Sequence, residues 1–405
     1  MSSYEERYAE VIIRTGVNLY PGQCLNVTTG YHNYDFATVI AEVAYKAGAR
    51  YVNIDVVSNK ERKIRINNSE SCYLEYVPEF SVSRYHEMCA DDWAFVRIDD
   101  TEELSVLEGV DPEKLGIIEK AMRKSKSVFY KNLLKDKICW CVVCAPGPKW
   151  ADYLLGNEST DGLWQLLSPI LRLDHDDAVK AWSEHGERLL ARRRILDEMN
   201  IKTLHFKNAD TDLKIGLTST SRWHGGPSYT LDKRLFIANI PTEEVFTTPD
   251  FRKTEGYVKV TRPLKVLETM VEGASFEFKD GKVVNFSAQK NEAVLRKYLA
   301  IDEGASFVGE VALVGCDSPL YTSGKVFGSI LYDENAASHI ALGSGYPSCL
   351  SNMNSLHGDD DLKSAGCNVS LVHTDFMIGS ESMRVTAVCE DGKEVVVMEN
   401  GLFVI

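Results

Sequence analysis

The sequence predicts two folds in succession: an α/β N-terminal domain with a mostly parallel sheet, and a β-rich α+β C-terminal domain. Three observations support this prediction. The first half alternates helical and strand patterns, which is typical of a parallel sheet covered by helices. The second half consists mainly of short strands in which polar and apolar residues alternate. Asp-Gly or Asn-Gly joins three pairs of these strands, and such dipeptides are the strongest local signal for a hairpin.

The elements of the first half follow one another in a regular order. Periodicity predicts helices at 3–16, 35–49 and 176–200, and strands at 21–29, 51–57, 92–99 and 138–145. The run "ICWCVVCA" at 138–145 is apolar throughout, which suits a central strand buried on both faces. The long charged helix at 176–200 ends this half, so we predict an N-terminal domain of residues 1–200.

The second half, residues 201–405, is predicted to form the β-rich domain. Alternating strands are expected at 202–208, 211–218, 255–264, 274–288 and 383–405. The hairpin turns are Asp280-Gly281, Asp391-Gly392 and Asn400-Gly401. A helix is predicted at 288–300.

Charge and composition exclude several kinds of partner. The 405 residues carry a formal net charge of −14, whereas nucleic acids and anionic membranes bind clustered Lys and Arg. The N-terminus has no apolar segment typical of a secretion signal, and the longest apolar run, 138–145, is too short to cross a bilayer. Ten cysteines show no framework spacing. We therefore expect reduced thiols and a cytoplasmic protein without nucleic-acid or membrane partners.

Several familiar site motifs are absent from the sequence. No strand is followed by G-x-G-x-x-G or by G-x-x-x-x-G-K-[ST], which argues against a nucleotide site. The segment "HEMCA" lacks the second histidine of a zinc-protease helix, and no G-x-S-x-G elbow occurs. Cys139, Cys141 and Cys144 lie within the apolar strand, so we predict buried core thiols rather than a metal site.

Ionisable residues embedded in apolar sequence are the main indication of chemistry. Each has an ordinary alternative: His339 alone suits a hydrogen-bonded core histidine, and Glu310 alone could pair with an arginine. On a strand, His373 and Asp375 are two residues apart and face the same side. The whole set comprises Glu243, Glu244, Glu310, His339, His373 and Asp375. Burying so many charges together is tolerable when divalent cations neutralise and coordinate them.

Four segments make the pattern recognisable. "NIPTEEVFTTPD", "GEVALV", "SHIALGSGYP" and "HTDFMIG", in this order and at these spacings, resemble the aminopeptidase T family. That family also contains aminopeptidase S and PepS, and its members are dinuclear metallo-aminopeptidases. Weaker similarities, such as "DHDDAVKAWSEHGERLLARR" and "VTRPL", extend over nearly the whole chain.

The resemblance implies a role for each matching residue. Glu310 corresponds to a ligand shared by two ions, which also makes it a catalytic residue. Tyr346 corresponds to a catalytic tyrosine, although "GSGYP" alone is also compatible with a tyrosine of the core or of a turn. The implied metal ligands are Glu244, Glu310, His339, His373 and Asp375.

Glu243 remains ambiguous because neighbouring residues of an extended segment point in different directions. We consider two catalytic roles for Glu243: a general base, or an anchor for the ammonium group of the substrate. The alternative is an outward glutamate bonded to a nearby Lys or Arg.

We therefore expect an aminopeptidase that cleaves short peptides with a free N-terminus. The resemblance implies two divalent ions per chain in the C-terminal domain and a homodimer that encloses the active sites. Glu, His and Asp ligands suit zinc, cobalt or manganese. Two alternatives remain: a two-metal hydrolase acting on another bond, such as a phosphoester, or a non-catalytic relative that binds metal or peptide.

Overall fold

A parallel sheet and a large antiparallel sheet form in different parts of the chain, as the sequence predicts. The computed structural model describes residues 3–103, 106–133, 135–267 and 269–405. Two compact units divide the chain: Met1–Glu184 with Pro227–Ile240, and His185–Gly226 with Pro241–Ile405. The chain therefore passes between the units three times, whereas domains of residues 1–200 and 201–405 imply one passage. The first passage lies within helix α10 (Ala178–Glu198).

The first unit is built on a five-stranded parallel sheet with the strand order β2-β1-β3-β4-β9. Its strands are β1 (Cys24–Gly30), β2 (Tyr51–Val57), β3 (Ala94–Asp99), β4 (Trp140–Cys144) and β9 (Asn239–Ile240). Its helices are α1 (Tyr4–Val11), α2 (Tyr34–Lys46), α3 (Asn59–Asn68), α4 (Ser71–Leu74), α5 (Glu79–Ala90), α6 (Pro112–Ser125), α7 (Ser127–Leu133), α8 (Pro148–Leu155) and α9 (Thr160–Leu167). The pair β7 (Ser228–Tyr229) and β8 (Leu235–Phe236) also belongs to this unit.

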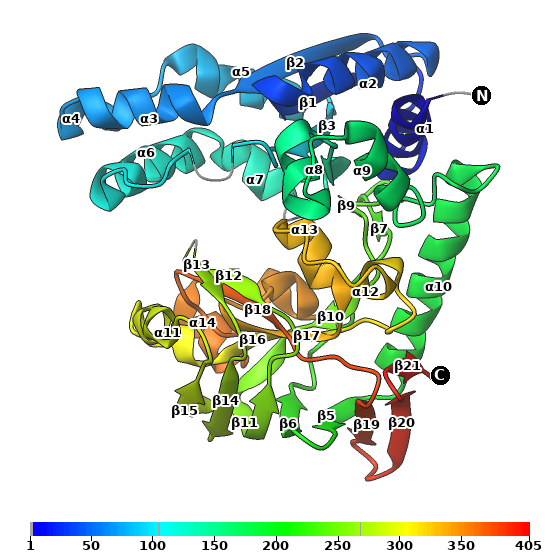
Figure 1. The fold of residues 1–405 in the computed structure, drawn as a ribbon, viewed down its shortest axis with the longest axis vertical. Coiled ribbons are helices and arrows are strands. Elements are labelled where there is room, and N and C mark those ends of the chain that lie inside the picture. The colour runs from blue at the N-terminus through cyan, green and yellow to red at the C-terminus, as the bar shows by residue number, and fades with distance from the viewer. Residues whose placement is uncertain (1–2, 104–105, 134, 268) are drawn as a thin grey trace. The chain divides into compact units, whose positions relative to one another are not determined.

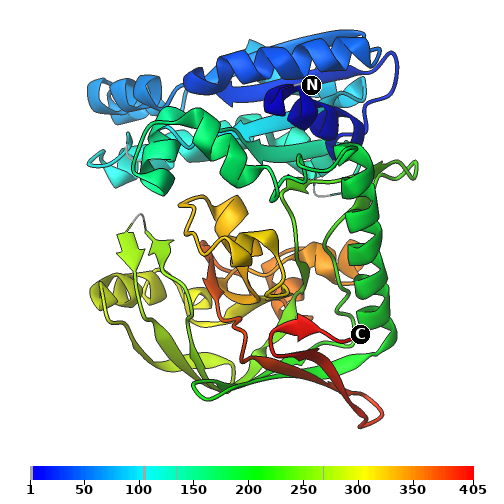
Figure 2. The same cartoon turned by 45° about the vertical axis from the view of Figure 1, so that its right-hand side comes forward.

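Helices cover this sheet because its connections reverse direction. The chain moves from β1 outward to β2, then returns past β1 to β3. Right-handed crossovers in opposite directions place α2 and α5 on opposite faces of the sheet (Figures 1 and 2). Cys139, Cys141 and Cys144 are buried free thiols in and beside β4, which confirms the prediction of core cysteines. The sequence patterns missed β9, which has only two residues.

The second unit contains an eight-stranded sheet in the order β15-β14-β11-β6-β5-β19-β20-β21, which Figure 1 shows as a row of arrows. Its strands are β5 (Ile201–Lys207), β6 (Asp212–Leu217), β11 (Pro249–Lys259), β14 (Ser275–Lys279), β15 (Lys282–Ser287), β19 (Arg384–Cys389), β20 (Glu394–Glu399) and β21 (Leu402–Phe403). The three predicted hairpins are all present. At two of the turns, Asp280-Gly281 and Asn400-Gly401, both residues have positive φ, which such tight turns require.

A second sheet in this unit has four antiparallel strands in the order β10-β16-β17-β18. They are β10 (Val245–Thr247), β16 (Val308–Leu313), β17 (His339–Gly343) and β18 (His373–Met377). The small pair β12 (Leu264–Val266) and β13 (Thr269–Val271) and the helices α11 (Glu292–Leu299), α12 (Pro319–Thr322), α13 (Ile330–Asp333) and α14 (Asp359–Ser364) complete the unit.

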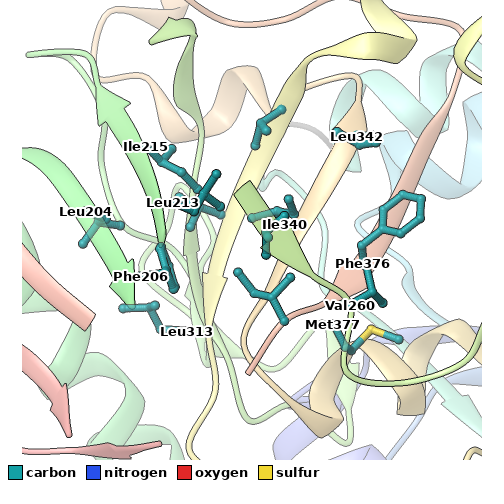
Figure 3. Close-up of a cluster of buried hydrophobic side chains, with 14 of the residues drawn as sticks. Leu204, Phe206, Leu213, Ile215, Val260, Leu313, Ile340, Leu342, Phe376 and Met377 are labelled. Atoms are coloured by element: carbon teal, nitrogen blue, oxygen red, sulfur yellow. The ribbon is translucent and has the colours of Figure 1, made fainter. Parts of the chain in front are cut away.

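The main hydrophobic core of the second unit joins its eight-stranded and four-stranded sheets. Val311, Ile340 and Phe376 lie directly opposite one another on adjacent strands, so they share one face of the four-stranded sheet. They cluster with buried residues of β5 and β6, among them Phe206 and Leu213 (Figure 3). The residues that alternate with this row, among them Glu310, Ala341 and Asp375, therefore lie on the other face of the four-stranded sheet. Among the described residues, the helices are too short or too polar to cross a membrane.

The packing of Phe376 predicts a large effect of its removal. Phe376 is fully buried and meets Phe276 edge to face, with 4.9 Å between the ring centroids. Phe376→Ala removes this packing and leaves a cavity, so unfolding of the metal-free protein should become easier by about 3–5 kcal/mol, measured from urea unfolding. Val284→Ala, at an exposed position of β15, should change stability by less than about 0.5 kcal/mol. Equal shifts for the two variants would contradict this account of the core.

Candidate metal centre

The second face of the four-stranded sheet brings together ionisable side chains from three strands. Glu310 lies opposite Ala341, and Ala341 lies opposite Asp375, so these three residues form one row across the sheet. His339 and His373 lie two residues from Ala341 and Asp375 along their own strands. Because side chains alternate between the faces of a strand, all four ionisable residues point to the same side. Ala341 at the centre of the row occupies little space.

A β-bulge on β16 sets the direction of Glu310. The register shifts between Val308 and Glu310, at Gly309. A Cβ atom at Gly309 would lie 2.3 Å from the carbonyl oxygen of Gly343, which leaves no room for a side chain. Bulges commonly re-aim a side chain beside a functional site, and glycine permits the close approach of two backbones.

Glu244 reaches the same cluster from the segment that precedes β10. Its carboxylate is buried, and its Oε2 lies 3.4 Å from Nε2 of His339. Gly225 packs against the backbone of this segment, because a Cβ atom there would lie 2.3 Å from the carbonyl oxygen of Glu244. The segment is therefore held in place from both its side chain and its backbone.

The ligand-type atoms form two compact groups that share one residue. Glu244, Glu310 and His339 form one group, and Glu310, His373 and Asp375 form the other. Within each group the oxygen and nitrogen atoms lie within 4.8 Å of one another. Glu310 belongs to both groups. The structure thus brings together all five residues that were predicted as ligands.

Both histidines are oriented as metal-binding histidines usually are. Nδ1 of His373 lies 2.7 Å from the carbonyl oxygen of Ser344, and Nδ1 of His339 lies 3.1 Å from that of Ala337. A carbonyl can only accept, so each Nδ1 carries the proton and donates it. The Nε2 atoms face the carboxylates: that of His373 lies 3.2 Å from Glu310 and 3.3 Å from Asp375. Such a backbone hydrogen bond fixes the tautomer and directs the other nitrogen toward a metal.

The charges of this cluster suit the binding of a cation. Oε2 of Glu244 and Oδ1 of Asp375 are buried, and neither accepts a hydrogen bond from the described residues. Burial and neighbouring carboxylates raise the pKa of Glu244 to about 8 and that of Glu310 to about 7. Burial opposes protonation of His373, but Asp375 and Glu310 outweigh this effect and raise its pKa well above the usual value. Divalent cations fit such a donor set because they replace the protons that the carboxylates otherwise retain.

Tyr346, for which a catalytic role remains a prediction, lies beside these groups. Its hydroxyl oxygen is 3.4 Å from Nε2 of His373. Its backbone N–H donates to the hydroxyl of Thr248 over 2.8 Å, and the same hydroxyl donates to its carbonyl oxygen over 2.9 Å. Burial and the charges of Glu310 and Asp375 raise the pKa of Tyr346 well above its usual value, so the phenol keeps its proton at neutral pH.

Glu243 points away from its neighbour, as expected for an extended segment. Its carboxylate lies 3.5 Å from Nε2 of His185 on α10, and it belongs to neither ligand group. His185 also contacts the carbonyl oxygen of Thr242 over 2.8 Å and Arg188 over 3.3 Å. Both catalytic roles of Glu243 remain predictions, while these contacts favour a third role, in which Glu243 docks the segment against α10.

Glu334 is a residue of this site that the sequence analysis did not identify. Burial and the charges of Glu244, Asp375 and Glu310 raise its pKa well above the usual value. It lies in a short 3₁₀ helix (Glu334–Ala336), five residues before His339. The signal available in the sequence was a carboxylate directly before the apolar segment "NAASHIAL".

The described part of the chain also contains a cavity of about 470 Å³ away from these residues. It is lined by β11, β14 and β15 of the large sheet and includes Asp210 and Lys259, which form a 3.2 Å ion pair. None of the grouped carboxylates or histidines lines it. We assign the chemistry to the groups around Glu310, where ligand-type atoms converge.

Comparison with known proteins identifies similar chains along the full length. The family model of thermophilic metalloproteases (M29) matches residues 2–403. Aminopeptidase 2 of Geobacillus stearothermophilus is 35% identical over 404 residues, covering 98% of this chain and 96% of that protein. Aminopeptidase PepS of Streptococcus thermophilus is 32% identical, covering 99% and 98%. The structure of wild-type AmpT from Thermus thermophilus aligns with a TM-score of 0.89 and 34% identity, covering 99% of both chains.

The shared position of Glu310 predicts how metal content responds to mutation. Glu310→Ala removes an oxygen donor from both groups at once, and two cations held by these groups would lose the common anion that reduces their repulsion. Elemental analysis should show fewer metal ions per chain than in the wild type, together with loss of most activity.

Glu381→Ala provides the control for this experiment, because Glu381 is an exposed residue of a turn in the same unit. It should keep the wild-type metal content. Two metal ions per chain with normal turnover in Glu310→Ala would rule out the assignment of a shared ligand.

Proposed function

Because the chain belongs to the M29 family of thermophilic metalloproteases and is a metallo-aminopeptidase, we propose that it removes N-terminal residues from short peptides with two divalent ions. The family resemblance found in the sequence is confirmed by relatives named aminopeptidase 2, PepS and aminopeptidase T. The number of ions and the length of the substrates are parts of the proposal.

One observation carries the two-ion proposal: Glu310 belongs to both groups of ligand-type atoms. A carboxylate has two oxygens and can bridge two cations, which a histidine cannot do once Nδ1 is protonated. We assign Glu244 and His339 to one ion, and His373 and Asp375 to the other. Both sets combine carboxylate oxygen and imidazole nitrogen, which zinc, cobalt and manganese accept.

The mechanism uses the ions and the protein side chains for different tasks. Divalent ions held by these residues would supply Lewis acidity, which would polarise a peptide carbonyl and lower the pKa of water. Tyr346 keeps its proton at neutral pH, so its O–H can donate to the oxyanion that develops at the scissile carbonyl. Thr248 holds the backbone of Tyr346 on two sides, which keeps this donor in position before the substrate arrives.

The phosphoester alternative is less well supported by the surroundings of the site. Phosphate groups are usually clamped by Arg or Lys. The charged groups that act most strongly on Glu244 and Glu310 are other carboxylates and histidines. A non-catalytic relative would not need Tyr346 to be positioned beside the ligands.

We also propose that the protein is a cytoplasmic homodimer whose active sites open into an enclosed space. This part of the proposal comes from the family resemblance and from the acidic, cysteine-containing composition. An enclosed site would admit short peptides and exclude folded proteins.

The proposed function predicts metal-dependent cleavage of substrates with a free α-amine. A panel of aminoacyl chromogenic amides should be hydrolysed by the metal-loaded enzyme, should resist hydrolysis after complete chelation, and should be cleaved again when zinc, cobalt or manganese is restored. Chromogenic phosphoesters serve as the control panel and should not be hydrolysed. Hydrolysis of the amides that survives complete metal removal would refute the proposal.

The contacts of Glu243 predict a structural effect of its mutation. Glu243→Gln removes the charge beside His185 and keeps the size of the side chain, so the protein should lose about 1–3 kcal/mol of stability while metal content and kcat change little. Urea unfolding, elemental analysis and steady-state kinetics measure these quantities.

His185→Gln provides a matched control for Glu243→Gln, because it removes the other partner of the same contact. The two variants and the double mutant form a cycle in which the losses of stability should not add. A decrease of kcat by about 10²–10⁴-fold in Glu243→Gln alone, at full metal content, would instead support the predicted general base.

A further inference from the structure

Phe246 is an aromatic residue on the same face of the four-stranded sheet as the predicted ligands, and the mechanism described above gives it no task. It lies opposite Ala312 on β16, and Ala312 lies opposite His339 on β17. Residues directly opposite one another on adjacent strands share one face of a sheet. Phe246 therefore points to the side that carries His339, whereas its neighbour Val245 belongs to the hydrophobic core.

The backbone of Phe246 is held along both edges of its strand. On one side β10 pairs with β16. On the other side the N–H of Phe246 donates to the carbonyl oxygen of His224 over 2.9 Å, and the N–H of His224 donates to that of Phe246 over 2.8 Å. The hydroxyl of Thr247 also donates to the carbonyl oxygen of Arg222 over 2.8 Å. Phe246 is thus a rigidly mounted side chain against which a neighbour can be positioned.

The ring of Tyr346 contacts two other rings at the site. Its centroid lies 5.5 Å from that of Phe246 and 5.1 Å from that of His373, and the interplanar angle is 58° in both pairs. Tilted pairs at such separations are favourable for aromatic side chains. Tyr346 is nevertheless 39% exposed, so the protein packs against only part of it. The orientation of its ring therefore depends strongly on the contact with Phe246.

The hydroxyl of Tyr346 cannot be held by a permanent hydrogen bond if it is to act on a substrate. It lies 3.4 Å from Nε2 of His373. The ligand assignment gives this nitrogen to a metal ion, because Nδ1 of the same ring already donates to the carbonyl oxygen of Ser344. A phenol that stabilises a developing oxyanion needs its O–H available when the substrate arrives. Packing of the ring then has to set the direction of the O–H.

We propose that Phe246 is a positioning residue that holds the ring of Tyr346 in the orientation in which its O–H meets the scissile carbonyl. This inference rests on the proposed function and adds a residue that acts through Tyr346. Thr248 fixes the backbone of Tyr346, and Phe246 restricts the torsions of its side chain. Because a misplacement of about 1 Å can cost about 10²-fold in rate, loss of the ring contact should lower kcat.

The substitution Phe246→Ala tests the proposal in the metal-loaded enzyme, with aminoacyl chromogenic amides as substrates. Loss of one aromatic pair corresponds to a decrease of kcat of about 3- to 10-fold, while KM should stay within about twofold of the wild-type value. Phe246→Leu keeps apolar bulk, so it should retain part of this factor, and it remains available if Phe246→Ala does not fold. Metal content, measured by elemental analysis, should stay at the wild-type value in both variants.

Phe286→Ala provides the matched control. Phe286 is also a partly buried phenylalanine of the second unit, but it lies on the edge strand β15 of the eight-stranded sheet. Its removal should leave kcat unchanged.

A double-mutant cycle with Tyr346→Phe separates positioning from a general structural effect. Tyr346→Phe removes the hydroxyl and keeps the ring. Because Phe246 acts through this hydroxyl, adding Phe246→Ala to Tyr346→Phe should lower kcat no further. Two losses that simply multiply would show that Phe246 acts independently of Tyr346 and would overturn the proposal.

The orientation of the ring provides a second readout that does not depend on turnover. In crystals of the metal-loaded wild type, Tyr346 should occupy one rotamer. In crystals of metal-loaded Phe246→Ala, it should occupy a different rotamer or more than one. Phe286→Ala should keep the wild-type rotamer.

Each other outcome overturns the proposal in a distinct way. A rise in KM at unchanged kcat would make Phe246 part of the substrate pocket, and loss of metal would make it a support for the ligands. An unchanged rotamer of Tyr346 in Phe246→Ala would remove the positioning role. If the wild type cleaves none of the amides, the proposed function fails, while the rotamer still decides whether Phe246 orients Tyr346.

Discussion

Mutual repulsion of buried carboxylates is the constraint on which the structure around Glu310 depends. Glu244 and Glu310 are buried beside Asp375, and two carboxylate oxygens of the cluster accept no hydrogen bond within the part of the chain that the structure describes. Without cations, such a cluster retains protons, as the raised pKa of Glu244 and Glu310 indicates. Such a cluster is tolerated when metal binding offsets the free energy lost by burying the carboxylates, because metal binding then contributes directly to the stability of the folded state.

The four-stranded sheet separates this cluster from the hydrophobic core by using the two faces of each strand. On β16, β17 and β18 one row of opposite residues is Val311, Ile340 and Phe376, which packs into the core. The adjacent row is Glu310, Ala341 and Asp375, which lies on the opposite face with the two groups of ligand-type atoms. The core therefore fixes the strands, and the strands fix the four predicted ligands that they carry, which are Glu310, His339, His373 and Asp375. Sites built on such rigid elements hold their geometry more accurately than sites on loops.

The parts of this architecture that depend on local pattern could be predicted from the sequence. The shared face of His373 and Asp375 follows from strand periodicity, and the hairpin at Asn400-Gly401 follows from turn chemistry. Features that depend on distant partners could not be predicted. The strand β9 has two residues and is defined by its parallel pairing with β4, which is distant in the sequence. The bulge at Gly309 depends on how closely β16 approaches Gly343, which no local pattern contains.

The adjacent residues Glu243 and Glu244 contact different parts of the second unit. Alternation along an extended segment sends Glu244 toward His339 and Glu243 toward His185. The backbone N–H of Glu243 donates to Oδ1 of Asn335, and the side-chain N–H of Asn335 donates to Glu334. A shift of the segment would therefore move the predicted ligand Glu244 and the carboxylate of Glu334 together. Since a displacement of about 1 Å can cost about 10²-fold in rate, the buried amide of Asn335 would help to keep the geometry of the site by holding this segment in place.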